Sequence, residues 1–308
     1  MPHFHNQTCF NNHMGVWLCE SRFMSSVLHE IQSGLRKPVE RVNSDLPPVA
    51  AFVINATPVS FNGIFSYWMS GDVAIISLDG PLMKAESKYG GTSTVAARKA
   101  IRAAVDDPRV GAIMLHIDSP GGHVSGTMEL AADVKAASKI KPTAAHADDL
   151  IASAAYWVGS SANRVTINRA GQAGSIGTVA VVHDISAAAE AEGVKVHVVS
   201  TGPDKGAFTP GAPVTDENLA YLRELVDSSN ALFQESVKEN RKLDSAKMAR
   251  VSSGRVFSAT ESVALGLVDA IMSFEQAIAD LAKQSTAKTT GNQRRERAAL
   301  ALDFDTMN

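Results

Sequence analysis

A glycine turn, a serine and a lysine follow one another along the chain in an arrangement that would suit acyl transfer. Ser153 lies in the small-residue run Ile-Ala-Ser-Ala-Ala at residues 151–155. Upstream, Gly121 and Gly122 follow a hydrophobic segment, and downstream Lys205 lies in a glycine-bounded loop. Acyl transfer needs a nucleophile, donors for an oxyanion and a base. The pattern predicts Ser153 as the nucleophile and Lys205 as the base.

The glycine turn and the residue after the serine are the predicted oxyanion donors. A strand followed by Gly-Gly and a helix lets the backbone approach a ligand closely, with amides free to donate. Alone, such a turn is more often only a tight connection. A phosphate-binding loop would need Gly-x-x-x-x-Gly-Lys-Ser/Thr, which the sequence lacks. We expect the amides of Gly122 and Ala154 to donate together.

Each candidate also has a purely structural interpretation. A serine among alanines is more often a small core or capping residue, and a single lysine is most often a solvated side chain. A Ser-His-Asp arrangement is the commonest alternative, and the candidate bases are His116, His146, His183 and His197. None has an evident acid partner in the sequence, so we interpret them as structural. A lysine desolvated against apolar walls can accept a proton near neutral pH, which favours Lys205.

The elements that must position these residues alternate between strand and helix patterns. Apolar runs predict strands at residues 73–78, 112–117, 142–146, 164–167, 178–182 and 194–199. Helical periodicity predicts helices at residues 95–105, 152–160, 185–191, 215–240, 245–251, 259–265 and 274–283, and one ending near residue 138. Thr92 or Ser93 would cap the first of these helices. The alternation indicates an α/β fold with a mostly parallel sheet, flanking helices and a C-terminal helical segment.

Length and composition fit an ordinary globular protein. The 308 residues can hold one large domain or two small ones, and 45% of them are hydrophobic and 20% charged. A formal net charge of -3 gives no electrostatic case for a nucleic-acid partner. We divide the chain into an N-terminal extension with a short helix near residues 25–35 (residues 1–70), an α/β domain (71–283) and a polar tail expected to be disordered (284–308).

The N-terminal cysteines and histidines predict neither a disulfide framework nor a metal site. Cys9 and Cys19 are the only cysteines, and a reducing compartment is compatible with them. With His3, His5 and His13 they match no standard zinc spacing, so no metal or cofactor is expected. The sequence has no run of about 18 apolar residues and no secretory signal. We therefore expect no membrane anchor and a cytoplasmic location.

Taken together, the motifs resemble the signal peptide peptidase A (SppA) family of Ser/Lys serine peptidases. The matching segments are Ile117–Gly122, Ala152–Tyr156, Gly174–Thr178, the lysine loop before Phe208, Gly254–Ser258 and Ala264–Asp269. The resemblance covers about residues 72–283 and implies a ClpP/crotonase-like fold. It implies Ser153 as nucleophile, Lys205 as base, Gly122 and Ala154 as oxyanion donors and Ser175 as the residue that orients the lysine. The family often has glycines where this chain has Ala154 and Ala155, and both replacements are small.

The resemblance also implies partners and a setting. Family members form cup-like homo-oligomers, and many bind a peptide substrate as an added strand. Anchorless members resemble phage or prophage head-maturation proteases, and residues 80–84 and 90–93 are similar to the phage-type proteins. We therefore expect a serine endopeptidase that cleaves capsid or scaffold proteins, in the cytoplasm or within an assembling procapsid. The alternatives are a cytoplasmic housekeeping peptidase, a noncatalytic assembly protein and a crotonase-like acyl-CoA enzyme.

Overall fold

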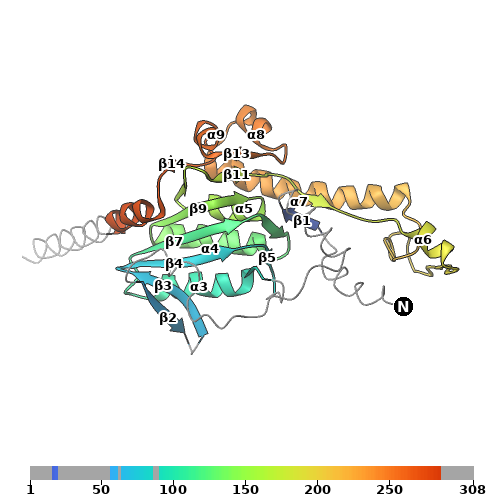
Figure 1. Cartoon of the computed structure of the whole chain (residues 1–308), viewed down its shortest axis with the longest axis horizontal. Coiled ribbons are helices and arrows are strands. Elements are labelled where there is room, and N and C mark those ends of the chain that lie inside the picture. The colour runs from blue at the N-terminus through green and yellow to red at the C-terminus, as the bar shows by residue number, and fades with distance from the viewer. Residues whose placement is uncertain (1–15, 20–55, 62–63, 86–89, 286–308) are drawn as a thin grey trace, which may run out of the picture.

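A computed structural model describes residues 16–19, 56–61, 64–85 and 90–285 (Figure 1). Two sheets organise this part of the chain, one of nine strands and one of five. The larger sheet runs in the order β13-β11-β9-β7-β4-β3-β2, and β10 pairs with β9 and with β14. Its strands are β2 (Thr57–Phe61), β3 (Ile64–Ser70), β4 (Val73–Asp79), β7 (Ala112–Ser119), β9 (Thr143–Ala152), β10 (Arg164–Ile167), β11 (Gln172–Gly174), β13 (Val256–Ser258) and β14 (Ala270–Ile271).

The centre of the large sheet is parallel and buried on both faces. β4, β7, β9, β10 and β11 pair in parallel, and β2, β3 and β13 add antiparallel edges. Alternate residues of β4 belong to two separate cores. Val73 and Ile75 are buried in the core on one face of the sheet, and Ala74 and Ile76 are buried in the core on the other face. A parallel sheet covered on both faces needs such continuous apolar strands. The expected α/β architecture with a mostly parallel sheet is confirmed.

Helices cover each face of this sheet. On one face lie α3 (Thr94–Asp106), α4 (Thr127–Ile140) and α5 (Ala154–Ser160), which pack successively on one another. The helical residues 274–285 cover the other face, where they bury Phe274, Ala277 and Leu281. Ser93 caps α3, because its hydroxyl accepts from the Ala96 amide at 3.3 Å, as one of the two predicted caps.

Several element boundaries differ from the predictions. Residues 57–61 and 64–70, assigned to the N-terminal extension, form β2 and β3; β3 pairs with β4, and β2 pairs with β3. β9 extends to Ala152, so the predicted helix at 152–160 begins two residues late, at Ala154. Register with β7 and β11 continues the strand beyond the apolar run from which it was predicted. The predicted strand at 178–182 is shortened to β12 (Val179–Ala180). The helix expected near residues 25–35 lies outside the described residues.

The smaller sheet assembles short strands from distant parts of the chain. Its order is β12-β1-β8-β5-β6, and its remaining strands are β1 (Val16–Cys19), β5 (Leu82–Met83), β6 (Thr92–Ser93) and β8 (Gly121–His123). β5 pairs in parallel with β6 and β8, whereas β1 is antiparallel to both β8 and β12. Residues close to the N-terminus therefore reach the glycine turn at Gly121 and Gly122.

A long extension, which we call the arm, consists of residues 181–228. It contains α6 (Ser186–Ala191) and the first half of α7 (Asp216–Arg241), and Figure 1 shows α6 at its free end, far from the sheet. Every residue from Gly177 to Leu232 is at least partly exposed. The strand predicted at 194–199 does not form, and Val199 in it is 97% exposed. A strand needs a sheet edge to pair with, and this segment runs along the arm instead.

The C-terminal segment returns to the body of the molecule. α8 (Ser245–Val251) and α9 (Ala259–Ala264) flank β13, as predicted from the Gly254–Ser258 region. Tyr156 of α5 donates to the Leu267 carbonyl at 2.8 Å, and Arg241 of α7 pairs with Asp269. The segment after α9 thereby holds α5 in place through the Tyr156 hydrogen bond. Within the described part of the chain, no helix is long and apolar enough to span a bilayer.

Candidate active site

Ser153 lies at the sharp turn between β9 and α5. Its backbone angles are φ 53 and ψ −118, a region that a residue with a side chain rarely adopts. Two backbone bonds fix it: the Ser153 amide donates to the Gly174 carbonyl at 2.8 Å, and the Ser153 carbonyl accepts from the Trp157 amide at 2.9 Å. Strained strand-to-helix turns of this kind present a nucleophile at the N-terminus of a helix.

The Ser153 side chain is buried among small residues at the start of α5. Ser153, Ala154 and Ala155 are completely buried in the single chain. The hydroxyl donates to the Gly177 carbonyl at 3.4 Å, a long and weak hydrogen bond. Because the first amides of a helix have no partner within it, the Ala154 amide is among those available to an anion at this point.

The glycine turn meets Ser153 at the same edge of the large sheet. Ser119 at the end of β7 pairs with Ile151 of β9, so Gly122 and Ser153 follow adjacent parallel strands. A Cβ on Gly122 would lie 2.0 Å from the Leu82 carbonyl oxygen, which makes glycine obligatory there. The Ser119 hydroxyl donates to the Gly80 carbonyl at 2.6 Å and holds the turn. The structure thus brings Gly122, Ser153 and Ala154 to one place.

Ser175 belongs to the same region. It directly follows Gly174, whose carbonyl accepts the Ser153 amide, and it is buried with φ 52. Its own amide donates to the Arg255 carbonyl at 2.8 Å. The Gly254–Ser258 motif therefore fixes Ser175 through β13, which pairs with β11. Two serines with positive φ therefore lie close together: Ser153 donates its amide to the Gly174 carbonyl, and Ser175 follows Gly174 in the chain.

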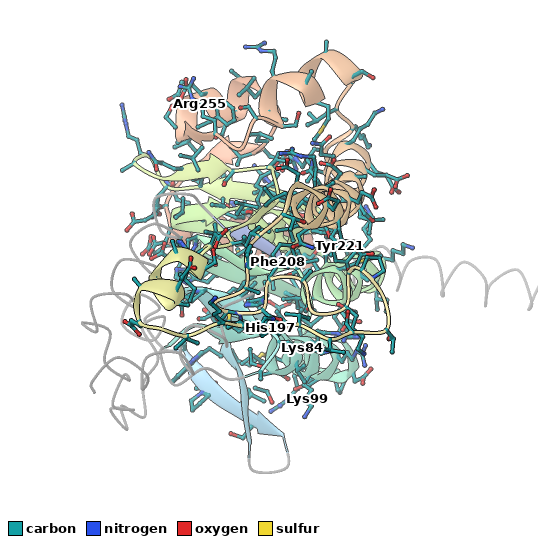
Figure 2. All side chains as sticks on the ribbon, turned by 90° about the vertical axis from the view of Figure 1, so that its right-hand side faces the viewer. Lys84, Lys99, His197, Phe208, Tyr221 and Arg255 are labelled. Atoms are coloured by element: carbon teal, nitrogen blue, oxygen red, sulfur yellow. The ribbon has the colours of Figure 1, made fainter. Side chains whose placement is uncertain are left out.

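Lys205 lies away from the other four predicted site residues. It is exposed in a turn of the arm, where its amide donates to the Gly202 carbonyl at 3.2 Å. The turn belongs to the compact free end of the arm, because Gly211 there contacts Val196 and Ala189 of α6. From Asp216 to Phe233, where α7 meets α5, the helix rises roughly 26 Å. Figure 2 looks toward this end, and His197 and Phe208 lie on it. A single chain does not bring Lys205 to Ser153.

The histidines of β7 and β9, His116 and His146, are buried and pack in the core. His116 and His146 contact Phe274 at ring distances of 4.5 and 5.4 Å, beneath the helical residues 274–285. Burial lowers the pKa of His146 to about 4 and also lowers the pKa of His116. His116 does have an acid neighbour, Asp148 at 3.7 Å, which the sequence did not reveal. Both rings lie on the face opposite α5.

Two acidic residues that the sequence analysis did not single out, Asp79 and Asp118, lie near the carboxyl ends of β4 and β7, close to the glycine turn. Burial, together with the nearby charges of Asp118 and Asp148, raises the pKa of Asp79 to about 6. The pKa of Asp118 is also raised, first by burial and then by Asp149 and Asp148. Asp79 and Asp118 end two adjacent parallel strands, so their proximity follows from the topology. The spacing of Asp-Gly and Asp-Ser after two apolar runs was the available signal.

No group of three or more His, Cys, Asp or Glu side chains is placed to hold a metal ion in the described part of the chain. His3, His5, Cys9 and His13 lie outside it. His123, next to Gly122 in β8, was not among the histidines considered from sequence, and its backbone partner is Trp17 of β1.

The chain has an α/β fold with a serine at a strained strand-to-helix turn, beside a glycine turn. This combination is typical of hydrolases that use a serine nucleophile. The model of Peptidase family S49 matches residues 135–288, half of the 308-residue chain. The chain belongs to this family. The match includes Ser153, Ser175 and Lys205, and begins after Gly122.

Curated relatives agree with this membership. The chain is 28% identical over 219 residues to "Capsid assembly protease C" of Escherichia phage lambda, covering 69% of this chain and 49% of that one. It is 28% identical to "Protease 4" of Salmonella typhi, over 71% of this chain and 35% of the relative. It is 27% identical to the chloroplastic "Serine protease SPPA" of Arabidopsis thaliana, over 69% and 32%. The chain thus spans half or less of the length of these relatives.

Proposed function

We propose that the protein is a serine endopeptidase that cleaves peptide bonds through an acyl-enzyme on Ser153. The observation that carries this proposal is the strained, buried Ser153 at the N-terminus of α5, next to the Gly122 turn. In the first step the Ser153 Oγ attacks the peptide carbonyl carbon, and the amides of Gly122 and Ala154 stabilise the resulting oxyanion. The amine then leaves with a proton, and water releases the acyl group.

The proton chemistry is assigned to Lys205, with Ser175 orienting its amine. A lysine accepts a proton only when it is neutral, and desolvation favours the neutral form. Lys205 is exposed on the arm of a single chain, so its desolvation and its approach to Ser153 both require another surface. We assign that surface to a second copy of the chain, whose body receives the arm. The ClpP/crotonase-like fold and a peptidase unit that ends near residue 283 belong to the same proposal.

The exposed apolar residues of the arm support assembly. Those with large exposed fractions are Ile185 41%, Val194 48%, Val198 44%, Val199 97%, Leu219 46%, Tyr221 36% and Leu225 40%. Exposed apolar area concentrated on one extension is typical of an interaction surface. A heterologous contact, in which the arm of one copy meets the body of the next, produces a ring when the rotation closes.

For the biological role we propose the processing of capsid or scaffold proteins during phage head assembly, within the procapsid. Support comes from the relative of phage lambda, whose name is that of a capsid assembly protease and of which this chain spans about half. The second candidate is a housekeeping peptidase like the bacterial Protease 4 relatives. Incubation with purified scaffold and with a model substrate such as casein separates them: preferential, site-specific cleavage of the scaffold supports the first.

Variants of the nucleophile test the chemistry. Ser153→Ala and Ser153→Gly both remove the hydroxyl, so each should abolish casein cleavage and labelling by a fluorophosphonate probe. The two should differ in stability, because only glycine relieves the positive φ; we expect Ser153→Gly to be more stable than Ser153→Ala by about 1 kcal/mol. Thermal denaturation measures the difference. Cleavage or labelling that persists in either variant would remove Ser153 from the mechanism.

A further inference from the structure

β1, four residues from the N-terminal region, lies between β12 and β8 in the small sheet. It pairs antiparallel with β8 through Trp17↔His123, Leu18↔Gly122 and Cys19↔Gly121. On its other edge it pairs antiparallel with β12 through Val16↔Ala180 and Trp17↔Val179. β8 and β12 meet in this sheet only through β1, with two strand spacings, about 9.5 Å, between them. We call this place between β8 and β12 the central strand position.

The two walls of the central strand position belong to segments that adjoin the candidate active site. One wall, β8, contains Gly122, whose amide is the proposed oxyanion donor. The other wall, β12, begins two residues after Gly177, whose carbonyl accepts the Ser153 hydroxyl. α5, which starts directly after Ser153, packs against β8. A strand in this position therefore lies between Gly122 and the segment that follows Gly177, the residue that accepts the Ser153 hydroxyl.

An extended peptide is the chemical class of ligand that such a position takes. Both walls offer main-chain donors and acceptors, and a strand inserted between them satisfies both edges at once. In the antiparallel register, the chain direction of β1 brings the peptide bonds around Leu18 and Cys19 closest to Gly122 and Gly121. Main-chain pairing of this kind reads the backbone, so the chain's own segment and a separate substrate can fill the same position.

We propose that residues 16–19 are a built-in competitor of the substrate: β1 fills the central strand position and must leave before another peptide can bind beside Ser153. This inference rests on the proposed function. Covalent attachment presents the segment at an effective concentration of the order of 1 mM. If the segment's own Kd is near 0.1 mM, occupancy at that concentration raises the apparent KM for a separate peptide about tenfold. Because the competition is for binding, kcat stays unchanged.

Removal of residues 1–19 from the full chain tests this competition. The shortened protein should cleave a fluorogenic peptide with a KM about tenfold lower and an unaltered kcat, as expected when a 1 mM internal competitor is lost. Leu18→Pro should act in the same direction, because proline removes the amide proton and interrupts strand pairing. Leu18→Ala keeps the amide and is the matched control, which should leave KM near the wild-type value. Equal KM values for all four proteins would overturn the proposal.

A binding measurement makes the result independent of catalysis. In the Ser153→Ala background, a fluorescent peptide with the sequence of residues 13–22 should bind the protein lacking residues 1–19 and bind the full chain at least several-fold more weakly. The same peptide with Leu18 replaced by proline should bind neither. Fluorescence anisotropy reports binding, and thermal denaturation confirms that the shortened protein is folded. A shortened protein that folds but fails to bind the peptide contradicts the competition.

The two proposals fail in different ways. If the peptide binds the shortened protein but no substrate is cleaved by any form, the endopeptidase assignment is wrong and the competition stands. If casein is cleaved equally well with and without residues 1–19, and the peptide does not bind, the competition is wrong and the endopeptidase assignment stands. Loss of cleavage on removal of a segment whose absence leaves the fold intact would show that β1 is part of the site rather than its competitor.

Discussion

At the scale of single residues, Ser153 and Asp79 are both energetically unfavourable in the folded chain, and both lie near the glycine turn. Ser153 has a strained backbone, and Asp79 is a partly buried carboxyl with two like charges nearby. Neither arrangement stabilises the fold. Strain and destabilised charge concentrate where function requires a fixed geometry, and both residues lie at the ends of strands that form the candidate site.

The raised pKa of Asp79 predicts a pH-dependent cost. Its folded pKa of about 6 exceeds the ordinary 3.8, so between these values the folded state binds more protons than the unfolded state. Stability therefore falls as pH rises through this window, and the cost is fully present above pH 6. Asp79→Asn should stabilise the protein at pH 7 by about 2 kcal/mol, less than the full shift because solvent screens a partly exposed group. Urea denaturation at pH 7 and pH 4 measures it.

The advantage of Asp79→Asn should shrink as the pH falls toward 4, because the wild-type carboxyl is then protonated too. Asp227, an exposed carboxylate on α7, supplies the control, since its replacement by asparagine should change stability by no more than about 0.5 kcal/mol. A gain at Asp79 that is the same at both pH values would contradict the electrostatic cause.

At the scale of elements, α7 performs two different tasks along its 26 residues. Its C-terminal half packs on α5: the rings of Phe233 and Trp157 stack at 5.1 Å, and Phe233 and Val237 are buried. Its N-terminal half projects into the arm, with no buried residue before Phe233. The capping box of Thr215 and Asn218 begins the helix out on the arm, where no core supports it. One helix therefore joins the body to the arm rigidly.

This division predicts unequal effects of truncation along α7. Phe233→Ala removes a fully buried ring and should destabilise the protein by about 3–5 kcal/mol. Leu225→Ala, two turns earlier, removes a side chain that is 40% exposed and should cost the single chain under about 1 kcal/mol. Denaturant unfolding at low protein concentration makes the comparison. Similar losses for the two variants would show that the arm packs against the body in the isolated chain.

At the scale of the whole molecule, the arm separates Lys205 from the other parts of the proposed site. A compact domain buries most of its apolar side chains, yet the whole range from Gly177 to Leu232 has none buried. The arm exposes apolar side chains and bears Lys205 of the proposed mechanism, which is why we propose that it assembles with further copies. Activity would then be a property of the oligomer.

Mixed assemblies test whether two copies build one site. Ser153→Ala and Lys205→Ala should each be inactive alone. Refolded together in equal amounts, they should recover about a quarter of the wild-type activity, because one in four heterologous contacts then joins an intact serine to an intact lysine. A peptide-cleavage assay on the separated oligomers measures it. Mixed assemblies that form but stay inactive would contradict a site shared between copies.

Much of the fold could be read from local sequence. The apolar runs at 73–78, 112–117 and 164–167 are strands because both faces of a parallel sheet must be apolar. The periodic residues 215–240 are helical from Asp216 onward, with Thr215 as the cap. The strand predicted at 194–199 fails because strand formation depends on an available edge rather than on apolar residues alone. The segment of β3, residues 64–70, was assigned to the extension for the converse reason: β4 offers it an edge that no local pattern reveals.

The sequence by itself determined which residues are candidates for the chemistry and their order: a glycine turn after an apolar strand, a serine among small residues, and a lysine in a loop. These are local signals, since each depends on backbone freedom or residue size within a few positions. The tertiary structure alone decided which of them meet. It joined Gly122, Ser153 and Ser175 through strand pairing, placed Lys205 on the arm and inserted β1 beside Gly122. Such contacts join residues far apart in the chain, and their energies come from packing and pairing that no local pattern records.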